Sequence, residues 1–255
     1  IMVYIYAKNA VGVLVEESLF VDGVNIFERK EGYFSIDKQQ FPMDENIEKN
    51  LGNNANNVSI INFLLTSYPL SAEHYLMKLN GFVNSMLWFR NLDIREFIGL
   101  ETNTTMLDEF IITNNLLEDF SDFLQKVSGQ KFQFIAHNST DKQILCKIDE
   151  NEVPFHLIAS TGTRSLQLLY FWLKRMCGAS FVFIDEFDAF YHFRLAFEVC
   201  KQLFDMDCQI FTSSHNTYLM TNDLLRPDCN FILNNNRIKC LSDCTDKELR
   251  FGHNI

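Results

Sequence analysis

Hydrophobic residues follow a strand–helix–strand pattern in the C-terminal third of the chain. Phe181–Ile184 is a continuous apolar run without alternation, which is typical of a strand buried on both faces of a parallel sheet. A helix-length segment, Ala189–Phe204, separates it from a second apolar run, Cys208–Phe211. Strand, helix and strand of this length form a βαβ unit, in which the two strands run in the same direction. The pattern predicts an α/β fold with a mostly parallel sheet.

The N-terminal part of the chain has the pattern of a β-meander. Asp22-Gly23 and Glu31-Gly32 are turn signals between short runs of β-prone residues. We expect residues 1–41 to form this meander and find no candidate chemistry in it. The predicted strands are Val3–Tyr6, Val11–Val15, Ser18–Val21, Val24–Phe27 and Tyr33–Ile36.

From residue 42 onward the spacing of apolar residues becomes helical. Ser71–Asn91 and Thr105–Val127 both carry apolar side chains at intervals of three and four residues, and Asn50–Asn57 reads as a polar loop. Such stripes usually belong to a hydrophobic core. We predict a helical insertion over residues 42–128, where a partner could dock, followed by a lobe at 129–255.

Polar residues follow both strands of the βαβ unit. Asp185 and Glu186 come directly after the first strand, and Thr212-Ser213-Ser214-His215 ends the second. Open α/β sheets bind ligands at the carboxyl ends of their strands. An aspartate there can hold Mg²⁺, usually through water, and a neighbouring glutamate can polarise an attacking water.

An apolar run followed by Asp-Glu is the Walker B pattern of P-loop ATPases. The simpler alternative is a strand whose charged end meets solvent. The βαβ spacing and the later Ser-Ser-His favour the functional interpretation.

A small, hydroxyl-rich loop, Ala159–Ser165, precedes an apolar helix predicted at Leu166–Cys177. Free N–H groups at a helix N-terminus, with hydroxyls beside them, can bind an anion. An ordinary N-cap by Ser160 or Thr161 explains the loop equally well when it is considered alone. Its position directly before the Asp-Glu strand favours phosphate binding.

Together these stretches resemble the AAA-type ATPases of the ABC/SMC/OLD lineage, in particular bacterial abortive-infection ATPases with an S-[ST]-G-T-[RK] signature. The resemblance is most specific over residues 153–255, and residues 1–152 are consistent with it. It implies a P-loop NTPase lobe of the ABC-head type. The residues that carry it are Ser160-Thr161-Gly162-Thr163-Arg164, FVFIDEFDAFYH, IFTSSHN, Leu241-Ser242-Asp243, Arg250 and Gly252-His253-Asn254.

This resemblance implies roles for the residues that follow the two strands. Asp185 would lie on the Mg²⁺ side, Glu186 would be the catalytic acid, and His215 would be the switch histidine near the γ-phosphate of ATP. Asp188 and His192 fall in the segment equivalent to the D-loop. His192 is equally well explained as a packed or capping histidine.

The resemblance also implies partners. The signature residues of one protomer would touch the γ-phosphate of ATP held by the other, so the active form would be a homodimer that passes a conformational signal to an effector. In abortive-infection relatives that effector is commonly a toxic nuclease, which implies a role in phage defence. The signature residues concerned are Ser160, Thr161, Gly162 and Thr163.

One expected motif does not occur. The sequence contains no G-x-x-x-x-G-K-[ST] loop, because none of its ten glycines is followed by lysine. We expect that loop to lie upstream of Ile1, and the C-terminal motif to continue past Asn254. By this interpretation the chain is an ATPase when a Walker A loop completes it and is inactive alone. We assign no Q-loop glutamine.

Composition limits the other function classes. The net charge of −11, from 22 basic and 33 acidic residues, does not support a general nucleic-acid-binding surface, although a local basic patch stays open. No apolar run approaches the roughly 20 residues of a membrane helix, and no signal peptide is visible. Seven scattered cysteines without a CxxC motif indicate reduced thiols. We therefore expect a cytoplasmic protein without a membrane partner.

Two other functions compete with the ATPase. A catalytically incomplete, ATPase-like scaffold or binding module would have the same fold, and a P-loop upstream of Ile1 would argue against it. A TOPRIM-like nuclease fits poorly, because it needs a separate upstream glutamate motif and a spaced aspartate pair. Here Asp185 and Asp188 straddle an apolar aromatic residue instead.

Overall fold

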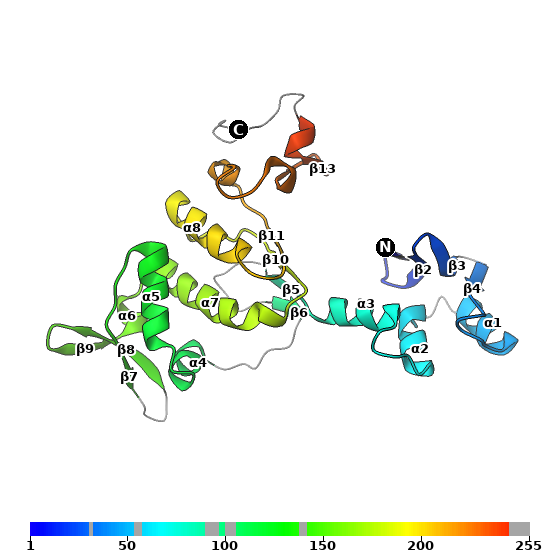
Figure 1. Ribbon diagram of the computed structural model, residues 1–255, viewed down its shortest axis with the longest axis horizontal. Helices are drawn as coiled ribbons and strands as arrows, with labels where there is room; N and C mark the ends of the chain where they lie inside the picture. The colour runs from blue at the N-terminus through cyan, green and yellow to red at the C-terminus, as the bar shows by residue number, and fades with distance from the viewer. Residues whose placement is uncertain (31–32, 54–57, 90–96, 100–105, 138–141, 245–255) are drawn as a thin grey trace. The chain divides into compact units, whose positions relative to one another are not determined.

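The structure is a computed structural model that divides into two compact units, Ile1–Gly81 and Phe82–Ile255 (Figure 1). Each unit has its own hydrophobic core. The residues that the structure describes are 1–30, 33–53, 58–89, 97–99, 106–137 and 142–244.

The first unit begins with the predicted β-meander, an antiparallel sheet in the order β1-β2-β3-β4. Asp22 and Gly23 have φ values of 50° and 82°, as the predicted hairpin turn requires. The prediction of separate strands at Val11–Val15 and Ser18–Val21 is wrong, because no turn residue interrupts β2. Glu31-Gly32 lies outside the described residues. The strands are β1 (Met2–Lys8), β2 (Leu14–Val21), β3 (Val24–Lys30) and β4 (Tyr33–Ile36).

Helices cover the apolar side of this meander. They are α1 (Glu45–Asn53), α2 (Ile60–Ser67) and α3 (Tyr75–Asn84), the last of which crosses the boundary between the units. The polar loop predicted at Asn50–Asn57 is wrong over 50–53, which end α1, and residues 54–57 lie outside the described residues. Apolar side chains of α2 and α3 join those of the meander and of Phe41 in one core, and α1 lies against β4. The buried members of that core are Leu19, Ile26, Phe27, Phe41, Ile60, Leu64 and Leu76.

A buried ion pair joins the sheet of the first unit to α2. Glu17 is fully buried, and its carboxylate accepts hydrogen bonds from Arg29 Nη2 (3.0 Å), Ser59 Oγ (2.8 Å) and the N–H of Ile60 (2.8 Å). A carboxylate at the first turn of a helix also interacts favourably with the helix dipole. Arg29 Nη2 donates in addition to the carbonyl of Val58 (3.1 Å). This network fixes β2, β3 and the start of α2 to one another.

The second unit contains a mixed four-stranded sheet in the order β11-β10-β5-β6. β10 is parallel to both β11 and β5, and β6 is antiparallel to β5. The predicted parallel pairing of the two strands of the βαβ unit is therefore confirmed. Ile184 lies opposite Thr212 on one side and Phe89 on the other, so three strands end at the same edge. The strands are β5 (Met86–Phe89), β6 (Phe97–Gly99), β10 (Phe181–Ile184) and β11 (Gln209–Thr212).

The strand β5 corrects a sequence prediction. A helix was expected over Ser71–Asn91, but α3 ends at Asn84 and β5 follows after one residue. Periodicity alone does not distinguish a short buried strand from a helical segment. Leu87 and Phe89 are each only 1% exposed, because β5 lies between β10 and β6 in the sheet.

The remaining elements of the second unit are helices and antiparallel strands. The helix expected over Thr105–Val127 is interrupted at Asn115, which has a φ of 56°. The helices are α4 (Leu107–Thr113), α5 (Leu117–Ser128), α6 (Phe155–Ile158), α7 (Thr161–Arg175) and α8 (Phe193–Phe204), with 3₁₀ turns at Met176–Gly178, Thr217–Leu219, Pro227–Cys229 and Leu241–Cys244. The strands are β7 (Phe134–His137), β8 (Gln143–Ile148) and β9 (Asn151–Pro154) in one sheet, and β12 (Phe231–Asn234) and β13 (Arg237–Cys240) in a hairpin.

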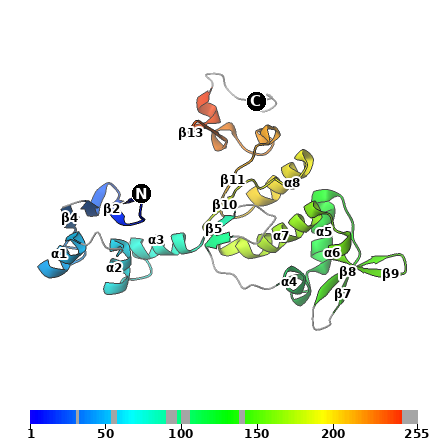
Figure 2. The same cartoon turned by 180° about the vertical axis from the view of Figure 1, so that it is seen from behind.

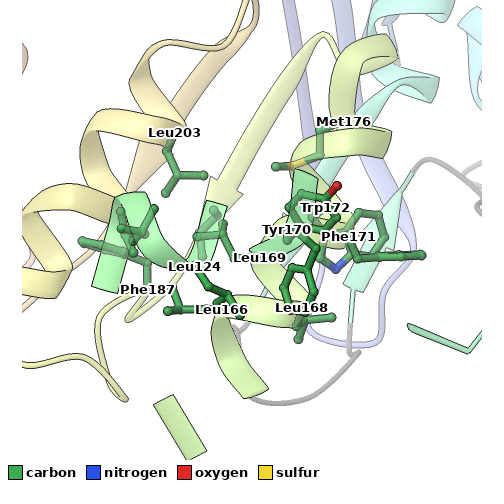
Figure 3. Packing of buried hydrophobic residues seen from close by; sticks show 14 of the residues in the cluster. Leu124, Leu166, Leu168, Leu169, Tyr170, Phe171, Trp172, Met176, Phe187 and Leu203 are labelled. Carbon is green, nitrogen blue, oxygen red and sulfur yellow. The ribbon is translucent and has the colours of Figure 1, made fainter. Parts of the chain in front are cut away.

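Helix α7 forms the centre of the second unit. Every side chain from Ser165 to Trp172 is buried, so the helix is covered on all sides. Figure 3 shows its residues in one cluster with Leu124, Phe187 and Leu203. Burial on this scale makes α7 a rigid support for the loop at its N-terminus.

A polar stripe fixes α7 to the neighbouring helices α4 and α5, which lie beside it in Figures 1 and 2. Gln167 Nε2 donates to Asp108 Oδ1 of α4 (2.7 Å), and Lys174 Nζ lies 2.7 Å from Asp119 Oδ2 of α5. Tyr170 also donates to Asp119. These bonds set the position of α7 along its axis as well as its rotation.

The two units divide the expected insertion between them. Over residues 42–128, α2 and α3 share the core of the meander, whereas α4 and α5 belong to the core around α7. The described residues form a mixed α/β structure with several sheets. None of the helices in these residues is long and apolar enough to span a bilayer.

The buried ion pair of the first unit yields a stability prediction. Replacing Arg29 by Met should leave the Glu17 carboxylate buried without its cation, a change that costs about 3–5 kcal/mol. Hydrogen exchange of the intact protein should show this loss at amides of β2, β3 and α2.

Lys78→Met is the matched control. It breaks the Lys78–Glu73 ion pair (2.8 Å), whose side chains are 57% and 87% exposed. Exposed pairs contribute about 0–1 kcal/mol. Equal losses of protection in the two variants would contradict the central role of the buried pair.

Candidate functional site

Asp185 and Glu186 lie at the sheet edge where β5, β10 and β11 end. The N–H of Asp185 donates to the carbonyl of Phe89 (2.9 Å), which joins β10 to the end of β5. On the other side, the N–H of Ser213 donates to the carbonyl of Ile184 (3.0 Å). The Asp185 side chain is half-buried, whereas that of Glu186 is 59% exposed. The structure thus places the predicted acid pair at the edge where such sheets bind ligands.

Ser213 contacts both acids. Its hydroxyl accepts a hydrogen bond from the N–H of Glu186 (2.8 Å) and donates its own proton to Asp185 Oδ1. Its carbonyl accepts from the N–H of Phe187 (3.3 Å). Ser213, the first residue after β11, therefore fixes the turn that follows β10.

Glu186 has a left-handed backbone, with a φ of 46°. A residue with a side chain in this region carries a strain of about 1–3 kcal/mol, which the surrounding bonds must offset. Its N–H donates to Ser213 Oγ, and its carbonyl accepts from the N–H of Ala189 (3.0 Å). The chain reverses sharply here, and the exposed Glu186 carboxylate is left available to solvent or a ligand.

His215 and Asp188 lie close to this turn. His215 Nε2 is 3.8 Å from Glu186 Oε1, and the histidine side chain is 95% exposed. Asp188 Oδ2 accepts a hydrogen bond from Ser214 Oγ (2.8 Å). The residues that follow β11 thus meet three of the predicted acids, and His215 can reach a ligand beside Glu186.

The prediction of a loop over Ala159–Ser165 is wrong beyond Ser160, because Ser160 is the N-cap of α7 and Thr161–Ser165 already belong to the helix. The signature loop, as the name is used below, is this N-cap and first turn of α7. The Ser160 hydroxyl accepts from the N–H of Thr163 (3.1 Å) and lies 2.8 Å from Thr163 Oγ1, which donates to Gln130 Oε1 (3.2 Å). Thr163 is 4% exposed, whereas Ser160 and Thr161 are exposed. The N-cap interpretation is therefore confirmed. An anion that approaches the loop would meet Ser160 and Thr161 before Thr163.

The loop packs against the turn that follows the acids. A Cβ atom on Gly162 would lie 3.3 Å from the carbonyl oxygen of Phe190, so glycine permits this close approach. Ser165 Oγ and Tyr191 OH are 2.9 Å apart, and both residues are buried. Burial raises the pKa of Tyr191, which therefore keeps its hydroxyl proton. Sequence reasoning assigned Gly162 to phosphate approach and did not anticipate this neighbour.

His192 is the N-cap of α8. Its Nδ1 accepts a hydrogen bond from the N–H of Leu195 (3.4 Å). The interpretation of His192 as a capping histidine is therefore confirmed.

The side chains present fit a hydrated Mg²⁺ rather than a metal held by protein alone. Mg²⁺ keeps several waters and is bound through one or two carboxylates together with substrate phosphates. Ser213 donates to Oδ1 of Asp185, and Oδ2 has no hydrogen-bond donor among the described residues. In the same residues, no group of three His, Cys, Asp or Glu side chains could hold a metal ion. Asp185 would hold the metal with phosphate and water.

Sequence reasoning did not assign Ser213, Ser214 or β5 to the site. Two features of the sequence could have indicated them. These are the two small hydroxyl residues between β11 and His215, and the apolar run Met86–Phe89. Arg250 and Gly252-His253-Asn254, which contributed to the family resemblance, lie outside the described residues.

A family model described as "AAA domain, putative AbiEii toxin, Type IV TA system" matches residues 35–221, more than two thirds of the chain. The chain belongs to this family. The matched segment contains the loop at Ser160–Thr163, the acid pair and His215. A search of curated proteins finds no match to the chain. Membership in this AAA family confirms the predicted relation to abortive-infection ATPases and supports a nucleotide-binding role.

The N-cap of α8 yields a prediction that tests whether His192 stabilises the helix. His192→Ala should destabilise the protein by about 1 kcal/mol, because it removes an N-cap acceptor. His192→Asn, which supplies another acceptor, should retain the melting temperature of the wild type. Thermal unfolding of the intact protein measures both. Equal stability of the alanine variant and the wild type would contradict the capping role.

Proposed function

We propose that this chain forms the metal-side and hydrolytic part of an ABC-type ATPase head in the AbiEii-type AAA family. The head binds and hydrolyses ATP with Mg²⁺ at a dimer interface and thereby switches a partner protein. The family match supports nucleotide binding. The observation that carries the hydrolytic role is the acid pair, which Ser213 fixes at the end of a central parallel strand with His215 beside it.

Each residue at this edge has a chemical task in the proposal. Mg²⁺ held at Asp185 would supply positive charge to offset that of the ATP phosphates. Asp185, half-buried and bonded to Ser213, supplies the metal-side carboxylate. Glu186 projects an exposed carboxylate that can orient a water and accept its proton. His215 lies close enough to Glu186 to donate to a phosphate oxygen on the same side.

A symmetric dimer completes the proposed site. Ser160 and Thr161 are exposed at the N-terminus of α7, where backbone N–H groups attract anions. No hydrogen bond among the described residues joins this loop to Asp185 or Glu186. In a two-fold dimer the N-terminus of α7 of one protomer, with Ser160, Thr161 and Gly162, faces the nucleotide of the other. Thr163 supports the loop through Ser160 and Gln130.

Dimer formation and release would then carry the signal to an effector. The family description names a type IV toxin–antitoxin system, which fits a defence role for the head. A role in phage defence and a nuclease-like effector are what the resemblance to abortive-infection ATPases implies. Helices α4 and α5 are bonded to α7, the helix that carries the signature loop at its N-terminus. A movement of α7 would therefore also move the outer surface of the α4–α5 pair.

One observation favours a second candidate, a non-hydrolysing scaffold. The sequence contains no G-x-x-x-x-G-K-[ST] loop, and Asp185 alone supplies only a metal-side anchor for the nucleotide. The ATPase proposal requires that loop to come from outside residues 1–255. ATP hydrolysis by the intact protein separates the two candidates.

Substitution of each acid tests the division of roles. In the intact protein, Glu186→Gln should keep ATP binding and slow turnover by roughly 10²–10⁴-fold, the usual contribution of one general base. Asp185→Asn should instead weaken binding of the Mg²⁺–nucleotide complex. Calorimetry gives the affinities, and phosphate release gives the rates.

Asp205→Asn is a control for charge, because Asp205 is an exposed acid at the end of α8. It should bind and hydrolyse ATP as the wild type does. Normal turnover by Glu186→Gln would move the water-polarising role to another residue, with His215 the next candidate. A wild-type protein without turnover would favour the scaffold.

A mixing experiment tests the composite site. Ser160→Asp keeps an N-cap acceptor but places a negative charge where the phosphate of the partner's ATP would lie. The variant should therefore fold normally, with an unchanged melting temperature, but fail to dimerise with ATP and to hydrolyse it. Mixed with Glu186→Gln protomers, it forms heterodimers in which one site carries both changes and the other carries neither. Partial activity should return.

Heterodimers are verified by two affinity tags on the two protomers. If each single variant is inactive and the verified heterodimer is inactive too, then independent sites shared between protomers are the wrong model.

A further inference from the structure

We infer that Ser213 is a positioning residue for the acid pair, and that its hydroxyl sets both the metal affinity of Asp185 and the placement of Glu186. The inference rests on the proposed ATPase function. It adds a residue that neither the signature nor the acid motif includes. The structural basis is that one hydroxyl bonds to two successive acids.

The two hydrogen bonds use Ser213 Oγ in opposite directions. The N–H of Glu186 can only donate, so Ser213 Oγ accepts that bond (2.8 Å). Its single proton then goes to Oδ1 of Asp185, whose ionised carboxylate can only accept. A side chain that both donates and accepts is required, and serine or threonine meets this requirement where alanine does not.

The bond to Asp185 orients a carboxylate that would bind metal. With Oδ1 occupied by Ser213, Oδ2 is the oxygen left for a cation or its water shell. Hydrogen bonds of this kind to a ligating carboxylate typically change metal affinity or activity by about 10–100-fold when they are removed. Metal affinity is therefore the most direct readout of the Ser213 hydroxyl.

The bond to Glu186 maintains a conformation that the residue does not favour by itself. Glu186 has a φ of 46°, and its N–H is fixed by Ser213 Oγ. Without that bond the turn can relax and move the carboxylate away from its position beside His215. Misplacement of a reacting group by about 1 Å can cost on the order of 10²-fold in rate.

The main-chain bonds of Ser213 do not depend on its hydroxyl. Its N–H donates to Ile184 (3.0 Å), and its carbonyl accepts from Phe187 (3.3 Å), so both bonds persist when the side chain is shortened. Ser213→Ala is therefore expected to preserve the β10–β11 pairing and to remove only the two side-chain bonds. This separates the positioning role from a role in folding.

The test compares the wild type, Ser213→Ala, Ser213→Cys and Ser213→Thr in the intact protein. Cysteine keeps the size of the side chain but is a weak hydrogen-bonding group, whereas threonine keeps the hydroxyl. Mn²⁺ binding is measured by electron paramagnetic resonance with ATP present and with Glu186→Gln added to stop turnover. Rates are measured separately with Glu186 intact.

We expect the alanine and cysteine variants to bind Mn²⁺ about 10–100-fold more weakly and to turn over about 10–100-fold more slowly than the wild type. Ser213→Thr should restore most of both properties. The control is Thr66→Ala, which removes a hydroxyl that donates to the Asn62 carbonyl within α2 (2.8 Å). It should leave Mn²⁺ affinity and turnover unchanged.

Each alternative outcome contradicts a defined part of the account. If the wild type hydrolyses ATP but Ser213→Cys binds Mn²⁺ and turns over normally, the positioning role is wrong and the ATPase proposal stands. If threonine fails to rescue while the melting temperature falls in all variants, Ser213 acts only in folding. If the wild type neither binds Mn²⁺ with ATP nor hydrolyses ATP, both proposals are overturned.

Discussion

The parallel pairing of β10 with β11 is the constraint on which the site depends. It brings Ser213 opposite the first turn after β10, where one hydroxyl and two main-chain groups bond to residues 184–187. That turn contains Glu186 in a left-handed conformation, which persists only where neighbouring bonds fix it. On the other side of β10, the carbonyl of Phe89 at the end of β5 accepts a hydrogen bond from the N–H of Asp185. A sheet edge without these neighbours would not present the two acids in this arrangement.

Helix α7 extends this constraint to the hydroxyl-rich loop. Because the helix is buried on all sides and fixed to α4 and α5 by polar side chains, the position of Ser160 is set by the core of the unit. The same helix contacts the turn after the acids through Gly162 and Ser165. The loop and the acid pair therefore share one rigid support although no hydrogen bond among the described residues joins them directly.

The sequence allowed the βαβ unit, the acid pair and the N-cap of α7 to be predicted, because each depends on local pattern. Phe181–Ile184 followed by Asp-Glu needs no knowledge of distant residues. The strand β5 was missed because its four apolar residues fit a helix equally well, and only its place beside β10 decides between the two. The hydroxyl pair Ser213-Ser214 is visible in the sequence, but the bonds of Ser213 and the contact of Gly162 with Phe190 depend on tertiary structure.

The central claim, that this sheet edge binds the Mg²⁺–ATP complex, can be tested by metal-directed cleavage of the backbone. Fe²⁺ replaces Mg²⁺ in the intact protein, and ascorbate with hydrogen peroxide generates hydroxyl radicals at the bound metal. Mass spectrometry then locates the cuts. The account predicts ATP-dependent cuts within residues 184–187 and 213–215, the two segments that meet at Ser213. Cuts that are independent of ATP, or that fall only in the first unit, would contradict it.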